Sequence, residues 1–321
     1  MSAKISLKGM WEVIKDTFQG FSDNKVTKLS GSLAYSTVFS MGPLLIVIIY
    51  LCSLFLGREA AEGKVYSSLE GFLGHDTALQ LQDIIKKAWV NGHGHVAIVL
   101  GVIMLVLGAT SIFSEIQDSI NDIWGLKPKP KKGWLKMIQN RLLSFSVIVS
   151  LGFLLLVSLT ITTFIDGFSK SLGEMFPGVA VIIFYIFNQV VTLGVSTLIF
   201  GVIFKVLPDA AITLKDVLGG AVVTALLFMA GKAGISFYIS KSNVGSTYGA
   251  AGSLIVLLLW VYYSSIILYL GAEFTKAYAV KYGSPIHPNE YAVTTKQIEV
   301  ETGKKTVQQK EAETPDAPIQ K

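Results

Sequence analysis

Six long apolar stretches constrain this chain more than any other feature of its sequence. A helix needs about 20 apolar residues, at ~1.5 Å each, to cross a hydrocarbon core of ~30 Å. All stretches but the second reach that length outright, and the second does so if its helix continues past Phe113. They are Leu33–Leu56, Val96–Phe113, Leu142–Ile165, Val179–Phe204, Val217–Ile239 and Ser253–Ala272. The pattern predicts an all-α, polytopic integral membrane protein with six transmembrane helices.

Basic residues between the stretches predict the orientation of the chain, because Lys and Arg in short loops stay on the cytoplasmic side. Alternate segments carry 20 Lys and Arg on one side and six on the other. Both termini are therefore predicted to be cytoplasmic, in a multi-pass protein of the bacterial inner membrane. The net charge of +5 is then explained by topology and by anionic lipid headgroups, so no nucleic-acid partner is expected.

Residues 1–30 predict an amphipathic helix at the membrane interface rather than a cleavable signal peptide. Their apolar residues recur at spacings of three and four, as expected for one helix face: Leu7, Trp11, Ile14, Phe18 and Phe21. Two arrangements fit this pattern. The helix packs on the cytoplasmic ends of the spans, or it contacts lipid directly.

The remaining segments divide the chain around a six-span domain over residues 31–280. The outer loop 57–95 carries an apolar stripe through Leu81, Ile84 and Trp89, which predicts short helices on the outer side. Residues 283–321 are rich in Pro, Lys and Glu, and a disordered cytoplasmic tail is expected there, with a short contact segment near Tyr291.

Metal, cofactor and catalytic chemistry have little support in the sequence. The single cysteine, Cys52, lies inside the first span, and His93 and His95 have no third ligand nearby. No G-x-x-x-x-G-K-[ST] phosphate loop exists, and no nucleophile stands beside a base. We therefore expect no enzyme activity, no bound metal and no cofactor.

Three separated motifs resemble those of the YihY/BrkB family of bacterial inner-membrane proteins. The first runs from Leu33 to Pro43, after Asp23, and the second joins Val206–Asp209 to Asp216–Ala221. The third comprises Tyr248–Ser253, Leu259–Tyr263 and Gly271–Glu273. Together they cover about residues 10–280 in the family's order, although Met41 and Gly42 replace larger apolar residues. The resemblance implies a six-span protein linked to envelope integrity, serum resistance and lipid movement.

Lys232 is the only ionisable residue in the core of a predicted span, and a charge there costs about 2.5–3.5 kcal/mol. It lies seven residues, roughly 10 Å, from the end of its stretch, a depth that a lysine can nearly escape by extending toward the interface. Two roles therefore fit Lys232: it extends its charge to the interface, or it binds an anionic group within the span. Other polar residues at a similar predicted depth complete a candidate lipid-headgroup site: Asn188, Gln189, Tyr262, Tyr263 and Thr160.

Small residues predict close helix packing on the fifth stretch. Gly220 and Thr224 are four residues apart, as are Ala221 and Ala225, and Ala230 and Gly234.

The favoured function is therefore binding or moving a lipid or lipid-linked envelope component, with membrane lipids and an envelope protein as candidate partners. A membrane scaffold for an envelope-assembly partner and a small-solute transporter are the alternatives.

Overall fold

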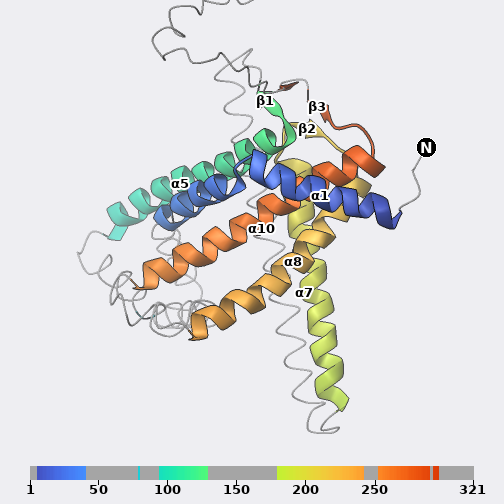
Figure 1. Cartoon of the computed structure of the whole chain (residues 1–321). Coiled ribbons are helices and arrows are strands. Elements are labelled where there is room, and N and C mark those ends of the chain that lie inside the picture. The colour runs from blue at the N-terminus through green and yellow to red at the C-terminus, as the bar shows by residue number, and fades with distance from the viewer. Residues whose placement is uncertain are drawn as a thin grey trace, which may run out of the picture.

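The computed structural model describes residues 6–40, 79, 94–128, 179–241, 252–289 and 292–295. This part of the chain is mainly helical, which agrees with the all-α prediction (Figure 1). Three of its helices are long and apolar enough to cross a membrane. The apolar segments of these helices are Ile186–Val206, Leu214–Ile235 and Leu254–Tyr282. The predicted span 142–165, most of the first span and nearly all of loop 57–95 lie outside the described residues.

The long helices follow the apolar stretches but extend beyond them. Helix α7 covers Val179–Val206, α8 covers Leu214–Lys241 and α10 covers Gly252–Tyr282. Helix α5, Gly94–Trp124, continues the second stretch without a break past Phe113, as a spanning helix there requires. It ends at Gly125, whose φ of +70° is a conformation that glycine adopts readily and other residues adopt rarely.

Helices α8 and α10 pack closely and antiparallel. Gly220 faces Thr275, and Thr224 faces Gly271. Both threonine side chains are fully buried, and Ala221 and Ala225 on α8 are also fully buried. The predicted small-residue packing is therefore confirmed for this part of α8.

The prediction is wrong for the third pair, Ala230 and Gly234. Ala230 is exposed, and nothing lies within 4 Å of a Cβ built at Gly234 among the described residues. Gly231 makes the close approach instead, because it lies three turns beyond Gly220 and faces α10, where it meets Tyr263.

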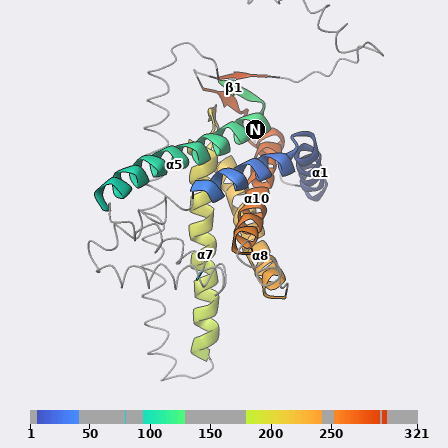
Figure 2. The same cartoon turned by 90° about the vertical axis from the view of Figure 1, so that its left-hand side faces the viewer.

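The apolar core lies where the C-terminal ends of α5, α7 and α10 meet the N-terminal end of α8. These ends are called the inner ends here, because the sequence predicts them on the cytoplasmic side. Figures 1 and 2 show the four helices converging there, while the first half of α7 extends away from the others. A helix over residues 26–40 lies beside α5, where Ser40 meets Gly108. Core members from several of these helices include Val26, Ile120, Phe204, Val217 and Tyr269.

Helix α1, Leu7–Asp23, packs antiparallel against the last turns of α10. Ser6 caps it, since its hydroxyl accepts a hydrogen bond from the Gly9 amide at 3.1 Å. Its buried residues are Gly9, Val13 and Thr17. The two ends of the contact are marked by Gly9, which meets the Tyr282 hydroxyl, and Gly20, which meets Glu273.

Two short antiparallel sheets join the tail to the inner loops. Strand β1, Leu126–Pro128, pairs with β4, Ala292–Thr294, and β2, Ala210–Ala211, pairs with β3, His287–Pro288. The tail strands lie on either side of position 291, near which the sequence predicts a short contact segment within the disordered tail. The polar composition does not show which loops these strands pair with, because main-chain groups make the pairing and the partner loops lie far away in sequence.

Candidate functional site

The predicted headgroup site centres on Lys232, which lies exposed on α8. The helix continues for nine residues beyond it, about 14 Å, to Lys241. Tyr263 of α10 comes to the same turn, because its hydroxyl lies directly against the backbone of Gly231. The structure thus brings Tyr263 next to the neighbour of Lys232, and Tyr262 lies half-buried one position earlier on α10.

The other predicted site residues are not brought to this turn. Asn188 is exposed and Gln189 half-buried, and both belong to the first half of α7. In Figures 1 and 2 this half of α7 diverges from α8 and α10. Thr160 lies outside the described residues.

The structure shows a second polar region at the inner ends of the helices, centred on Asp209. The buried Asn121 of α5 and Asp209 bind each other reciprocally. The Asn121 amide donates to the Asp209 carboxylate at 3.1 Å, and the Asp209 backbone N–H donates to Asn121 Oδ1 at 2.9 Å. Gln117 adds a longer bond of 3.4 Å, and the Asp209 carbonyl accepts from the Asn289 N–H at 3.0 Å. Asp209 therefore connects α5, the α7–α8 turn and the tail.

Asp216 fixes the start of α8 in the same region. Thr213 precedes the helix and donates its hydroxyl to the Asp216 carboxylate at 2.6 Å, while the Asp216 N–H points back to that hydroxyl at 3.4 Å. The same carboxylate accepts from the Ser284 N–H at 3.0 Å. A negative charge in the first turn of a helix is favourable, so Asp216 both caps α8 and holds the tail.

Glu273 is the most deeply buried carboxylate described, with 2% of its surface exposed. Asn24 donates to its Oε1 at 2.6 Å. A side chain at Gly20 would overlap the carboxylate, so glycine is what lets Glu273 lie against α1. A buried carboxylate needs such a donor, because an unsatisfied charge in the interior is costly.

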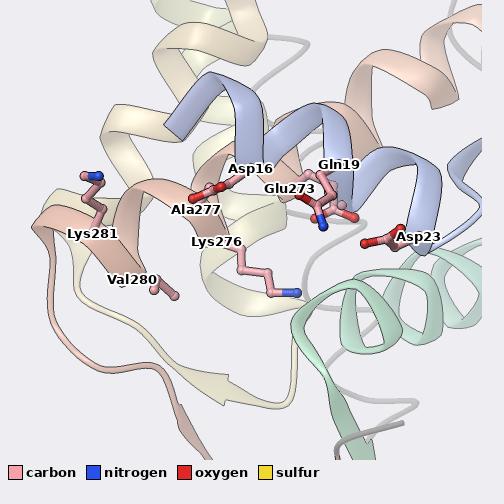
Figure 3. A pocket seen from close by; sticks show the side chains of 9 residues that line it. Asp16, Gln19, Asp23, Glu273, Lys276, Ala277, Val280 and Lys281 are labelled. Carbon is pink, nitrogen blue, oxygen red and sulfur yellow. The ribbon is translucent and has the colours of Figure 1, made fainter. Parts of the chain in front are cut away.

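A cleft of about 510 Å³ opens beside Glu273, between α1 and α10 (Figure 3). It is lined by three carboxylates and two lysines: Asp16, Asp23, Glu273, Lys276 and Lys281. Both lysines have partners outside this group. Lys276 donates to the Ile123 carbonyl at the end of α5 at 2.6 Å, and Lys281 pairs with Glu12. Among the residues described, no cluster of carboxylates, histidines or cysteines could hold a metal ion.

Acidic residues also gather on the inner part of α5, around Asp118. The side chain of Asp118 is exposed overall, but neighbouring groups partly shield its carboxyl from water. This partial loss of hydration, together with the negative charges of Asp122, Glu115 and Asp209, raises the pKa of the Asp118 carboxyl above its ordinary 3.8. The inner surface of α5 therefore carries a repulsive cluster next to the Asp209 network.

Asp209 and Glu273 both belong to the motifs named above, but the sequence alone indicates only a turn at Asp209 and no role for Glu273. A carboxylate directly after the apolar stretch that ends at Ala272 was the available signal for Glu273. Its donor, Asn24, is 249 positions away in the chain, so no local pattern connects the two.

The described part of the structure has three helices of span length, and two of them, α8 and α10, pack through small residues. Polar groups near one end of these helices are hydrogen-bonded to one another. These features define a multi-pass α-helical membrane protein. Comparison with known proteins agrees with this class. The family model described as "Virulence factor BrkB" matches residues 17–292. The chain belongs to the BrkB family.

Relatives with similar sequences carry names that describe only their membrane nature. A UPF0761 membrane protein of Alteromonas mediterranea is 25% identical over 257 residues, covering 79% of this chain and 83% of the relative. One from Aggregatibacter aphrophilus is 26% identical, covering 82% and 91%, and one from Pseudomonas aeruginosa is 28% identical, covering 78% and 59%. No solved structure matches the chain.

Proposed function

We propose that this chain binds a lipid or lipid-linked envelope component with an anionic headgroup and moves it within or across the bacterial inner membrane. The proposed topology has six spans with both termini in the cytoplasm. The role is non-enzymatic and needs no cofactor, with membrane lipids rather than nucleic acid as partners.

The observation that carries this proposal is the position of Lys232. It is a cation exposed on the segment Leu214–Ile235, which otherwise has the length and hydropathy of a membrane span. A charge at such a site is costly unless it reaches water, a counter-charge or a ligand. An anionic headgroup is a ligand that suits an exposed cation at this depth, while acyl chains lie along the apolar helix surface.

Tyr263 supports the same site through its geometry. Its hydroxyl lies against Gly231, so α8 and α10 approach closely beside Lys232. A tyrosine hydroxyl donates and accepts hydrogen bonds, which suits recognition of phosphate oxygens. Two different helices thus contribute polar groups to one turn of α8.

Native mass spectrometry of the purified protein, with identification of released lipids, tests the proposal. We expect the wild type to retain an anionic lipid, Lys232→Met to lose it at normal expression, and Lys232→Arg to keep part of it. Lys215→Met is the matched control, because Lys215 is an exposed lysine of the same helix near its inner end. Equal lipid retention in Lys232→Met and wild type would show that the lysine only extends to the interface.

A further inference from the structure

Helix α1 presents an apolar stripe that no described part of the protein covers. Its packing face toward α10 consists of small and medium residues, Gly9, Val13 and Thr17. The bulky apolar residues lie on another face. Their exposed fractions are 94% for Leu7, 68% for Trp11, 37% for Ile14 and 62% for Phe18.

Single exposed apolar residues are ordinary on protein surfaces, but a continuous stripe of them is not. These four side chains recur at spacings of four, three and four residues, so they form one ridge along nearly the whole helix. Leaving such a ridge in water is unfavourable by about 25 cal/mol per Å² of apolar surface. Some apolar phase or partner must therefore cover it.

The position of α1 favours lipid as that phase. Both views show α1 running crosswise to α7 near the inner end of that helix (Figures 1 and 2). It packs on the last turns of α10, whose span-length apolar segment continues to Tyr282. The chain then passes directly into the helix over 26–40, where Tyr35 and Phe39 expose further aromatic surface on the predicted first span.

Charges on α1 match a membrane surface. Lys8 and Lys15 are exposed and lie about 80–100° around the helix from Leu7, along one edge of the stripe. Lys25 and Lys28 are exposed just after α1. A helix with an apolar face bordered by lysines binds in the interface of a bilayer that contains anionic lipid.

We propose that α1 is an interfacial membrane helix that inserts Leu7, Trp11, Ile14 and Phe18 into the leaflet beside the C-terminal end of α10, with anionic lipid as its partner. This inference does not depend on lipid binding at Lys232. It also orients the cleft. Asp16 is nine positions from Leu7, about 180° around the helix, so the cleft beside Glu273 opens to water when the stripe lies in lipid.

Spin labels on single cysteines in full-length Cys52→Ser protein test the proposal in nanodiscs of phosphatidylethanolamine and phosphatidylglycerol. Trp11→Cys and Phe18→Cys report on the stripe, and Asp16→Cys and Gln19→Cys are controls on the cleft side of α1, about 180° and 120° around the helix from Leu7. All four side chains are exposed, so the labels leave the contact with α10 in place. We expect oxygen to relax the stripe labels and a water-soluble nickel chelate to relax the controls.

Strong relaxation of the stripe labels by the nickel chelate would overturn the proposal, since the stripe would then lie in water. Weak relaxation by both reagents would also overturn it, because a protein partner or a second copy would then cover the stripe. Replacing the lipids with pure phosphatidylcholine, or introducing Lys8→Gln with Lys15→Gln, should lower oxygen relaxation of the stripe labels at least about twofold. No change in either case would refute the anionic-lipid part.

Discussion

Thr224 of α8 and Thr275 of α10 occupy reciprocal positions in the contact between their helices. Each lies against the glycine that precedes the other threonine by four residues, Gly271 for Thr224 and Gly220 for Thr275. Each hydroxyl donates to the carbonyl of the glycine on its own helix, at 2.7 Å in both cases. The contact therefore buries two hydroxyls without leaving either unsatisfied, which matters in a membrane where water cannot replace a lost partner.

Alanine at Gly220 or Gly271 should separate α8 from α10. The new methyl group would overlap the facing threonine side chain, so each variant should lose about 1–3 kcal/mol of stability, the usual cost of overpacking. Thermal unfolding in detergent measures the loss. Gly234→Ala on α8 is the control, because its added Cβ meets nothing within 4 Å of the described structure. It should be as stable as wild type or up to about 1 kcal/mol more stable, since alanine favours a helix over glycine. Equal stability of all three variants would refute the close contact.

Asn121→Ala should destabilise the inner end of the protein. It removes both hydrogen bonds of the pair with Asp209, one of them to a charged group, and bonds of that kind contribute about 1.5–3 kcal/mol. Gln117→Ala should cost less, because its bond to Asp209 is long at 3.4 Å. Chemical unfolding monitored by tryptophan fluorescence compares the two. A larger loss for the Gln117 variant would contradict the assigned roles.

Asp118→Asn should raise the melting temperature at pH 7. The folded state raises the pKa of this carboxyl, so the folded state binds its proton more tightly than the unfolded chain does. The contribution of Asp118 to the free energy of unfolding is therefore most favourable below pH 3.8, and it falls as the pH rises through the folded-state pKa. The advantage of the asparagine variant should accordingly disappear in acid.

Melting curves of wild type and Asp118→Asn between pH 3 and pH 8 check this, with Asp16→Asn on α1 as a control for a general effect of charge. An advantage that persists unchanged at the lowest pH would mean that repulsion within the α5 cluster is not its cause.

The proposed orientation predicts opposite labelling at the two ends of α8. In a Cys52→Ser background, Lys241→Cys should react with a membrane-impermeant thiol reagent added to intact spheroplasts. Lys215→Cys should react only after lysis. The two sites lie 26 residues apart on one helix, about 39 Å, which is long enough to cross the hydrocarbon core. The reverse pattern would place the termini outside.

Hydropathy predicted the long helices because a membrane span must be apolar along its whole length. The inner polar network was not predicted for a different reason. Asn24 and Glu273 are brought together only when α1 folds back along α10, and nothing in either local sequence records that contact. Residue spacing also predicted a close helix contact at Gly234, whereas the contact is made by Gly231. A period of four indicates a face of small residues, but it does not show which helix that face meets.

The predicted headgroup site shows the same limit. Depth along each stretch placed Asn188, Gln189 and Tyr263 in one layer, since depth follows from counting residues. The crossing angles of the helices do not follow from counting. The structure accordingly brings Tyr263 to the turn of Lys232 and carries the first half of α7 away from it.

The central claim, that Lys232 binds an anionic headgroup, is tested most directly by lipid-dependent stabilisation. A ligand at 100 times its dissociation constant stabilises a folded protein by about 2.7 kcal/mol. The melting temperature of delipidated wild type in detergent should therefore rise with added phosphatidylglycerol and much less with phosphatidylcholine. In a Lys8→Gln, Lys15→Gln background, which weakens anionic-lipid binding at α1, Lys232→Arg should show part of the rise and Lys232→Met almost none. An equal rise in Lys232→Met and wild type would contradict the account.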